Sequence, residues 1–347
     1  MQRPLLCMIP LCLATGLACG DADDDTNPGD ASGGDDHGSS SGGSSGGGGG
    51  DASSSGGAGD EDASSGGGGD GTDAGDSSGG SDSGAPAIEP QLPAPTGACP
   101  AIVDGDVEFA PAGMPARAVR LYLGDDTGEA APLLFYWHAT GSAPAEAEYA
   151  LGAALADFGA HGGIVVAPHA DPSAGTFEWF IVNQSSKLDD FLLADEIVAC
   201  LAEAGRIDPR RIHTMGMSAG ALQTTAFSFM RSDYLASVAT YSGGLPAGFS
   251  VPDQQPDNPF AALIFFGGAS DLYGPLDFAE ASANYGMALR EAGRFAPMCD
   301  HGGGHTIPLD AAPSVLEFFA AHPFGTDPSP YAAGLPASFP DYCALPR

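Results

Sequence analysis

The hydrophobic pattern divides the chain into a front part without periodicity and a back part in which strand and helix patterns alternate. Runs of almost wholly apolar residues, typical of strands buried on both faces of a sheet, cover residues 132–138, 163–168 and 261–266, and residues 211–216 and 236–241 predict two more strands. Residues 118–123 alternate apolar and polar positions and predict a further strand, and residues 295–299 predict the last one.

Segments with helical spacing lie between these strands, at residues 145–160, 188–204, 219–230, 276–291 and 309–321. Alternation of strands and helices predicts an α/β fold, with a mostly parallel sheet and helices on both faces. In such a sheet, ligands bind beyond the carboxyl ends of the strands. Candidate chemistry is therefore sought where the predicted strands end.

Residues 1–19 have the pattern of an export signal. Arg3 supplies a positive start, and the apolar stretch from Leu5 to Leu17 is too short to span a bilayer as a helix. The stretch ends in Ala18 and Cys19, which resembles a bacterial lipoprotein signal, so Cys19 is the expected lipidation site. Ordinary cleavage and release is the alternative. We expect an exported protein, lipid-anchored at the cell envelope or surface, or secreted.

Residues 20–97 predict a disordered linker. They hold 25 of the 52 glycines and 16 of the 45 acidic residues, with no Lys or Arg. Large apolar residues are almost absent before Ile88, so the segment cannot bury enough surface to offset its ordering entropy. Residues 98–347 then form one domain, long enough for a single large core.

The net charge limits the expected binding partners, and the cysteine content indicates disulfides rather than a metal site. The net charge of −34 argues against nucleic acid and anionic lipid, so membrane contact is expected only through the lipid anchor. The cysteines of the exported domain are even in number, which suggests two disulfides of undetermined pairing; they are Cys99, Cys200, Cys299 and Cys343. None has the spacing of a zinc site, so no metal is expected.

The sequence Gly216-Met217-Ser218-Ala219-Gly220 lies between a predicted strand and a predicted helix. In that context the glycines permit a tight turn that lifts the serine hydroxyl clear of the sheet. Ser218 is therefore the candidate nucleophile, and the Ala219 amide a candidate oxyanion donor. A serine that only caps its helix is the alternative.

A serine nucleophile needs a base and an orienting carboxylate. His305 follows three glycines in the loop after the last predicted strand and is favoured over His301, whereas His322 looks like a surface residue. Asp271 follows the strand at 261–266 and gives the order Ser…Asp…His of α/β-hydrolases. Its rivals are Asp277, which looks like a helix start, and Asp300, beside the glycine loop.

The loop after residues 132–138 is expected to supply a second oxyanion donor. We favour the Ala139 amide, with Thr140 as the alternative, and interpret His138 as an imidazole that braces the loop. Residues 177–180 are rich in aromatic side chains. They either line the substrate pocket, with Trp179 as a binding residue, or form an aromatic cluster in the core.

The chain resembles the α/β-hydrolases of the polyhydroxybutyrate depolymerase and feruloyl/acetylxylan esterase group over residues 118–322. The matching motifs are Phe135-Tyr-Trp-His-Ala-Thr-Gly-Ser142, residues 206–221, Phe266-Gly-Gly-Ala-Ser-Asp271 and Gly302-Gly-Gly-His-Thr-Ile-Pro308. The resemblance implies an α/β-hydrolase fold and a triad that coincides with Ser218, Asp271 and His305. The family usually has Gly where this chain has Ala139, and Trp where it has Ile307, a position expected at the substrate site.

Two enzyme functions and one other function fit these observations. The first is a serine carboxylesterase acting on hydroxyalkanoate oligomers or polymer, and the second an esterase acting on plant polysaccharide esters. Both work through an acyl-enzyme and need no cofactor. The third is a surface-displayed binding protein whose triad is silent, which the complete Ser/Asp/His set disfavours. A peptidase is disfavoured because no propeller or large cap domain is predicted.

Overall fold

The computed structural model describes residues 88–249, 251 and 258–345. The predicted export signal with Cys19, and the predicted linker up to residue 87, lie outside the described residues. Within the described residues, no helix combines the length and the apolar character that a membrane crossing requires.

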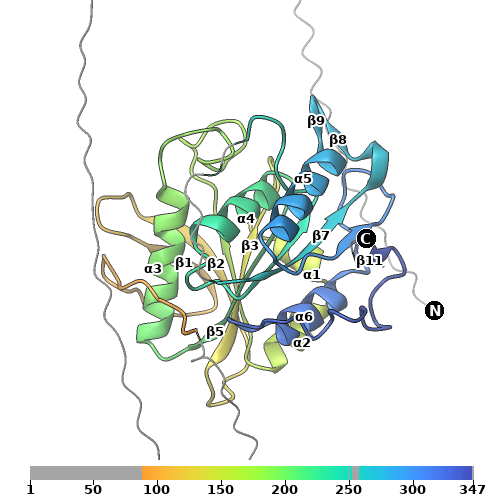
Figure 1. Cartoon of the computed structure of the whole chain (residues 1–347). Coiled ribbons are helices and arrows are strands. Elements are labelled where there is room, and N and C mark those ends of the chain that lie inside the picture. The colour runs from red at the N-terminus through yellow and green to blue at the C-terminus, as the bar shows by residue number, and fades with distance from the viewer. Residues whose placement is uncertain (1–87, 250, 252–257, 346–347) are drawn as a thin grey trace, which may run out of the picture. The chain divides into compact units, whose positions relative to one another are not determined.

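The described strands form a nine-stranded sheet in the order β1-β2-β4-β3-β5-β6-β7-β10-β11 (Figure 1). They are β1 (Gly105–Phe109), β2 (Arg117–Leu123), β3 (Ala131–Trp137), β4 (Ile164–Pro168), β5 (Ile207–Met217), β6 (Ser237–Tyr241), β7 (Ala261–Phe266), β10 (Met298–Asp300) and β11 (Cys343–Ala344). The central strands from β4 to β10 run parallel, whereas β1, β2 and β11 pair antiparallel toward the edges.

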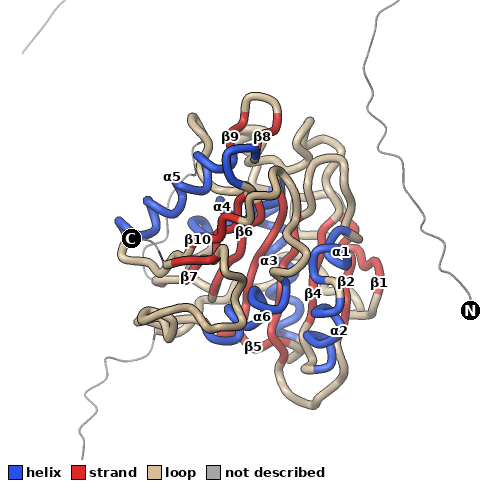
Figure 2. Tube along the Cα trace, turned by 90° about the vertical axis from the view of Figure 1, so that its right-hand side faces the viewer, coloured by secondary structure: helices blue, strands red, loops and turns tan. Residues whose placement is uncertain are grey.

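Helices cover both faces of the sheet (Figures 1 and 2). They are α1 (Glu146–Leu151), α2 (Ala153–Ala160), α3 (Asp189–Glu203), α4 (Ala219–Met230), α5 (Phe278–Glu291) and α6 (Ala312–Ala321). One core cluster joins the sheet to α3, α4 and α5, and a second joins it to α1, α2 and α6. This confirms the predicted fold class, a mostly parallel sheet with helices on both faces.

Several element boundaries differ from the prediction. The helix predicted over residues 145–160 is two helices that meet at Gly152, where φ is 51° and the helix cannot continue. The last parallel strand begins at Met298, later than predicted. The sequence pattern missed β1, β11 and a short hairpin of β8 (Leu272–Tyr273) and β9 (Leu276–Asp277). The strands β8, β9 and β11 have two residues each, which is too few for a periodicity.

Residues 88–97 correct the predicted domain boundary, because they lie on the folded domain. The amides of Thr96 and Gly97 donate to the carboxylate of Glu196 in α3, at 2.7 and 2.8 Å. The first described residues contact Arg210, near the amino end of β5, whose guanidinium donates to the carbonyl oxygen of Ile88. The chain therefore reaches the domain on the side of the sheet where β5 begins, opposite to the side where β5 ends.

The two predicted disulfides are present, and the fold fixes their pairing. Cys99 is bonded to Cys200 near the end of α3, which fastens the N-terminal segment to that helix. Cys299 in β10 is bonded to Cys343 in β11, directly opposite it in the antiparallel pair.

Candidate active site

Ser218 lies in the turn between β5 and α4, with the unusual backbone angles φ 55° and ψ −119°. A non-glycine residue adopts these angles only where its surroundings enforce them. The neighbouring glycines are required because a Cβ on Gly220 would lie 1.8 Å from the Trp137 carbonyl oxygen, and one on Gly216 would lie 2.5 Å from the Gly220 oxygen. This packing places the nucleophile turn directly against the end of β3.

The structure brings His305 and Asp271 to Ser218. His305 Nε2 lies 2.8 Å from Ser218 Oγ, and His305 Nδ1 lies 2.7 Å from Asp271 Oδ1. With Nδ1–H donating to the carboxylate, Nε2 is free to accept the serine proton. The three side chains come from the segments that follow β5, β7 and β10, at the carboxyl edge of the sheet.

The Asp271 carboxylate is completely buried and fully hydrogen-bonded. Its second oxygen accepts from the Ser242 hydroxyl and from the Gly267 amide, each at 2.8 Å. Ser242 itself has φ 53°, so the strained end of β6 holds its hydroxyl toward Asp271. Sequence reasoning missed Ser242, because a serine after a strand carries no signal of its own.

The alternative candidates for the base and for the orienting carboxylate make other contacts. The His301 ring packs against Tyr342 and accepts from the Gly303 amide through Nδ1. Asp277 caps α5 by accepting from the Glu280 amide, as its helix-start pattern indicated. Asp300 accepts from the Gly302 amide and so shapes the glycine loop.

The prediction that the Ala139 amide is an oxyanion donor is wrong. That amide donates to Glu146 Oε1 at 3.0 Å, and the Gly141 amide donates to Glu178 at 2.9 Å. Thr140 differs from both, because among the described residues neither its amide nor its hydroxyl has a hydrogen-bond partner, and the hydroxyl oxygen is buried. Ala219, the other predicted donor, is the first residue of α4, where an amide has no acceptor within the helix.

Glu146 holds this loop in place from the start of α1. Its Oε1 accepts from the Tyr136 hydroxyl as well as from the Ala139 amide, both at 3.0 Å. Burial, reinforced by the Glu146 charge, raises the pKa of Tyr136 well above its ordinary value. The phenol therefore stays a neutral donor, and the loop is fixed from inside the protein.

His138 braces the loop, as predicted. Its Nδ1 lies 2.9 Å from the Ala139 carbonyl oxygen, and its ring packs on Trp179 at 4.9 Å between centroids. The assignment of Trp179 as a substrate-binding residue is wrong, because this side chain is completely buried against Trp137 and donates to the His138 carbonyl oxygen at 3.0 Å. Ile307 is also misplaced by the prediction, since its side chain is buried in the core cluster beneath α6.

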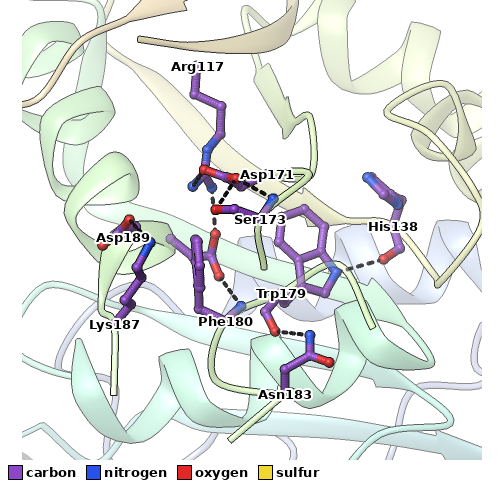
Figure 3. A network of polar contacts seen from close by, with 10 residues as sticks. Arg117, His138, Asp171, Ser173, Trp179, Phe180, Asn183, Lys187 and Asp189 are labelled. Atoms are coloured by element: carbon purple, nitrogen blue, oxygen red, sulfur yellow. Dashed lines mark hydrogen bonds and ion pairs between the residues drawn. The ribbon is translucent and has the colours of Figure 1, made fainter. Parts of the chain in front are cut away.

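A buried ion pair anchors the segment that carries Trp179 (Figure 3). Arg117, at the start of β2, pairs with Asp190 at the start of α3 and with Asp171 after β4. The other oxygen of Asp190 accepts from the Phe180 amide at 2.7 Å. Burial raises the pKa of Asp190, and the Arg117 charge opposes that rise.

An apolar pocket of about 280 Å³ lies next to the triad. Its apolar lining consists mainly of Phe177, Val182, Leu222, Phe249, Tyr273 and Leu276. Phe177 is the one side chain of the predicted aromatic run that reaches the pocket. Neither Trp179 nor Ile307 lines it.

Solved structures show what the whole arrangement is similar to. The native crystal structure of pOPH matches with a TM-score of 0.58 at 20% identity, over 72% of this chain and 96% of its own. The native structure of sOPH matches with a TM-score of 0.56 at 19% identity, over 74% and 97%. A thermostable esterase matches with a TM-score of 0.52 at 16% identity, over 63% and 62%. No family model matches the chain, and no curated protein matches its sequence. The chain has the α/β-hydrolase fold.

Proposed function

We propose that this protein is a serine carboxylesterase that hydrolyses ester bonds through Ser218, His305 and Asp271. The observation that carries the proposal is the continuous hydrogen-bonded line from the Ser218 hydroxyl through His305 to the buried Asp271 carboxylate. Nucleophile, base and orienting group thus have the mutual geometry that acyl transfer requires. One of the solved structures with a similar fold is an esterase, which supports the same class of reaction.

The residues suggest the following mechanism. His305 removes the proton from Ser218 as its oxygen attacks the ester carbonyl, and the imidazolium then protonates the departing alcohol. Asp271 holds the imidazole and stabilises its positive charge, while Ser242 and the Gly267 amide keep the carboxylate in place. A water molecule, activated by His305, then releases the acyl group from Ser218.

The oxyanion in this mechanism is stabilised by Ala219 and Thr140. The Ala219 amide belongs to the first turn of α4, so the helix dipole adds to its effect. Thr140 replaces Ala139 as the second donor, because its amide and its buried hydroxyl have no hydrogen-bond partner among the described residues, whereas the Ala139 and Gly141 amides do. Gly220 packs against the Trp137 and His138 carbonyl groups, which brings this loop to the nucleophile turn.

The remaining parts of the proposal come from the sequence. Cys19 is the proposed lipid attachment site of an exported protein, and residues between it and the domain serve as a tether. Hydroxyalkanoate oligomers or polymer are the proposed substrates, since the motifs around Ser218, Asp271 and His305 resemble those of depolymerases.

The test is hydrolysis of p-nitrophenyl acetate and butyrate by the full chain and by Ser218→Ala. We expect turnover by the wild type and a loss of several orders of magnitude in kcat for the variant. Ser228→Ala is the matched control, because this buried serine lies on α4 away from the triad. Equal rates for the wild type and Ser218→Ala, with both proteins folded, would refute the esterase proposal.

A further inference from the structure

The apolar pocket is connected to the triad through two of its walls. Leu222 lies one turn after the nucleophile, and its amide donates to the Ser218 carbonyl oxygen at 2.9 Å. Tyr273 follows Asp271 by two residues, and its ring centroid lies 5.8 Å from that of His305. A group attached to an ester carbonyl at Ser218 therefore has the pocket directly beside it.

The chemistry of the lining is almost entirely hydrocarbon. Among the described residues around the pocket none is charged, and the polar side chains are Gln184 and the Tyr273 phenol. A sugar ring placed there would bury hydroxyl groups without partners, which costs free energy. A hydrocarbon group would instead be transferred from water into an apolar site, which is favourable.

Hydrogen bonds and a buried ion pair hold one wall of the pocket in place. The wall that contains Phe177 and Val182 belongs to the segment held by Asp190 and Arg117, and the Phe177 amide donates to Asn183 Oδ1 at 3.2 Å. Toward solvent, the β8–β9 hairpin continues the apolar surface, because Leu272 and Tyr273 are each 52% exposed. The cavity of about 280 Å³ is near the lower end of the size range of small-molecule sites.

We infer that this pocket is a subsite for a bulky hydrocarbon group of the ester, and that the natural substrates are apolar esters rather than sugar esters. The inference rests on the proposed esterase function and adds to it the kind of ester group that the pocket binds. Each methylene group buried in the pocket is expected to raise kcat/KM roughly fourfold, until the cavity is full.

Two ester series test the inference and show which half of the ester enters the pocket. One keeps p-nitrophenol and lengthens the acyl chain from acetate to decanoate; the other keeps acetate and lengthens the alcohol from methyl to octyl. We expect kcat/KM to rise with chain length in one series and to reach a maximum where the chain fills the cavity. A rise in the acyl series assigns the pocket to the acid, and a rise in the alcohol series assigns it to the alcohol.

Ala247→Trp provides the structural link, because Ala247 is an exposed residue of the lining and a large ring there fills the cavity without disturbing the core. We expect it to abolish the gain from long chains, so that kcat/KM no longer rises from acetate to the ester that the wild type hydrolyses fastest. Ala333→Trp, at an exposed alanine outside the pocket, is the matched control and should leave the profile unchanged. Phe177→Ala enlarges the cavity and should move the maximum to longer chains.

Each outcome decides between the two proposals. Acetate hydrolysis that depends on Ser218, combined with no dependence on chain length in either series, would overturn the subsite and leave the esterase intact. The same holds if Ala247→Trp lowers kcat/KM equally for every ester. Activity no greater than that of Ser218→Ala on all esters would remove the esterase function itself.

Discussion

Thr140 is the residue whose hydrogen-bonding groups the surrounding loop leaves free. Its buried hydroxyl has no partner among the described residues, and a buried donor without a partner is costly unless a ligand completes it. In the proposed mechanism that ligand is the oxyanion, so the unpaired hydroxyl is part of a prepared site rather than a packing fault.

Thr140→Val removes this hydroxyl while keeping the size and branching of the side chain. We expect kcat for p-nitrophenyl butyrate to fall by about 10²-fold with little change in KM, because the lost hydrogen bond forms only as charge develops on the oxygen. Thr140→Ser should recover most of the rate. Thr224→Val is the control, since that hydroxyl is also buried and unpartnered but lies farther along α4. A kcat for Thr140→Val equal to that of the control would exclude the hydroxyl as a donor.

Some residue roles could be predicted from the sequence, and others depend on side chains that meet only in the fold. Ser218, Asp271 and His305 are predictable because each follows a strand whose end lies at the same edge. The Ala139 prediction failed because that amide donates a hydrogen bond to Glu146 at the start of the next helix. His322 was expected at the surface, but it is buried. Its ring packs against Phe318 and neighbouring aromatic rings, and its Nε2 is hydrogen-bonded to the Ser329 hydroxyl.

At the scale of elements, the segment between β4 and α3 shapes both the loop that follows β3 and the apolar pocket. Trp179 supports the loop through the His138 carbonyl group, and Phe177 forms part of the pocket wall. The segment has little regular secondary structure of its own, so its position depends on the buried pair of Arg117 and Asp190.

Arg117→Met should therefore cost stability as well as activity. It leaves the Asp190 carboxylate buried without its cation, and we expect a loss of about 3–5 kcal/mol in the free energy of unfolding, measured by urea denaturation. The double variant Arg117→Met/Asp190→Asn should regain more than half of this loss, because the amide is neutral and its oxygen can still accept from Phe180. If the double variant is no more stable than the single one, the loss does not come from the unpaired charge.

The central strands and the longer helices were predictable, because buried parallel strands are continuous apolar runs and helix periodicity is clear over ten or more residues. The β8–β9 hairpin was not, although it forms one wall of the pocket. Each of its strands has two residues, so pairing across the hairpin and packing around Tyr273 define it rather than any pattern along the chain.

At the scale of the whole molecule, buried histidines tie stability to pH. Burial lowers the pKa of His213 to about 3, with the nearby Arg211 and His322 adding to the effect, and burial also lowers the pKa of His322. In the unfolded chain a histidine titrates near 6.5. Between these values the unfolded state binds more protons, so stability is present above about pH 6.5 and is lost as the pH falls below it.

We expect urea denaturation midpoints to fall steadily from pH 7 to pH 5. Each of these histidines contributes up to roughly a tenfold change in the unfolding equilibrium constant per pH unit below about pH 6.5. His213→Asn, which keeps an acceptor for Ser237, should flatten the dependence by the equivalent of one proton, whatever its effect on absolute stability. An unchanged slope in this variant would mean that His213 is not the responsible group.

The disulfide pairing also belongs to this scale. Cys99 and Cys200 are 101 residues apart, and they meet only because the N-terminal segment runs along α3. No spacing rule along the chain could select that pair from the three possible arrangements.

The path of the N-terminal segment has a practical consequence for immobilisation and fusion. Arg210 receives the first described residues near the amino end of β5, whereas Ser218 follows the carboxyl end of the same strand, roughly 25 Å away along an extended chain. A bead or reporter protein joined directly at residue 88 would therefore be attached on the side of the domain turned away from Ser218. A bulky or particulate ester can approach the opposite side without competing with the attachment for space.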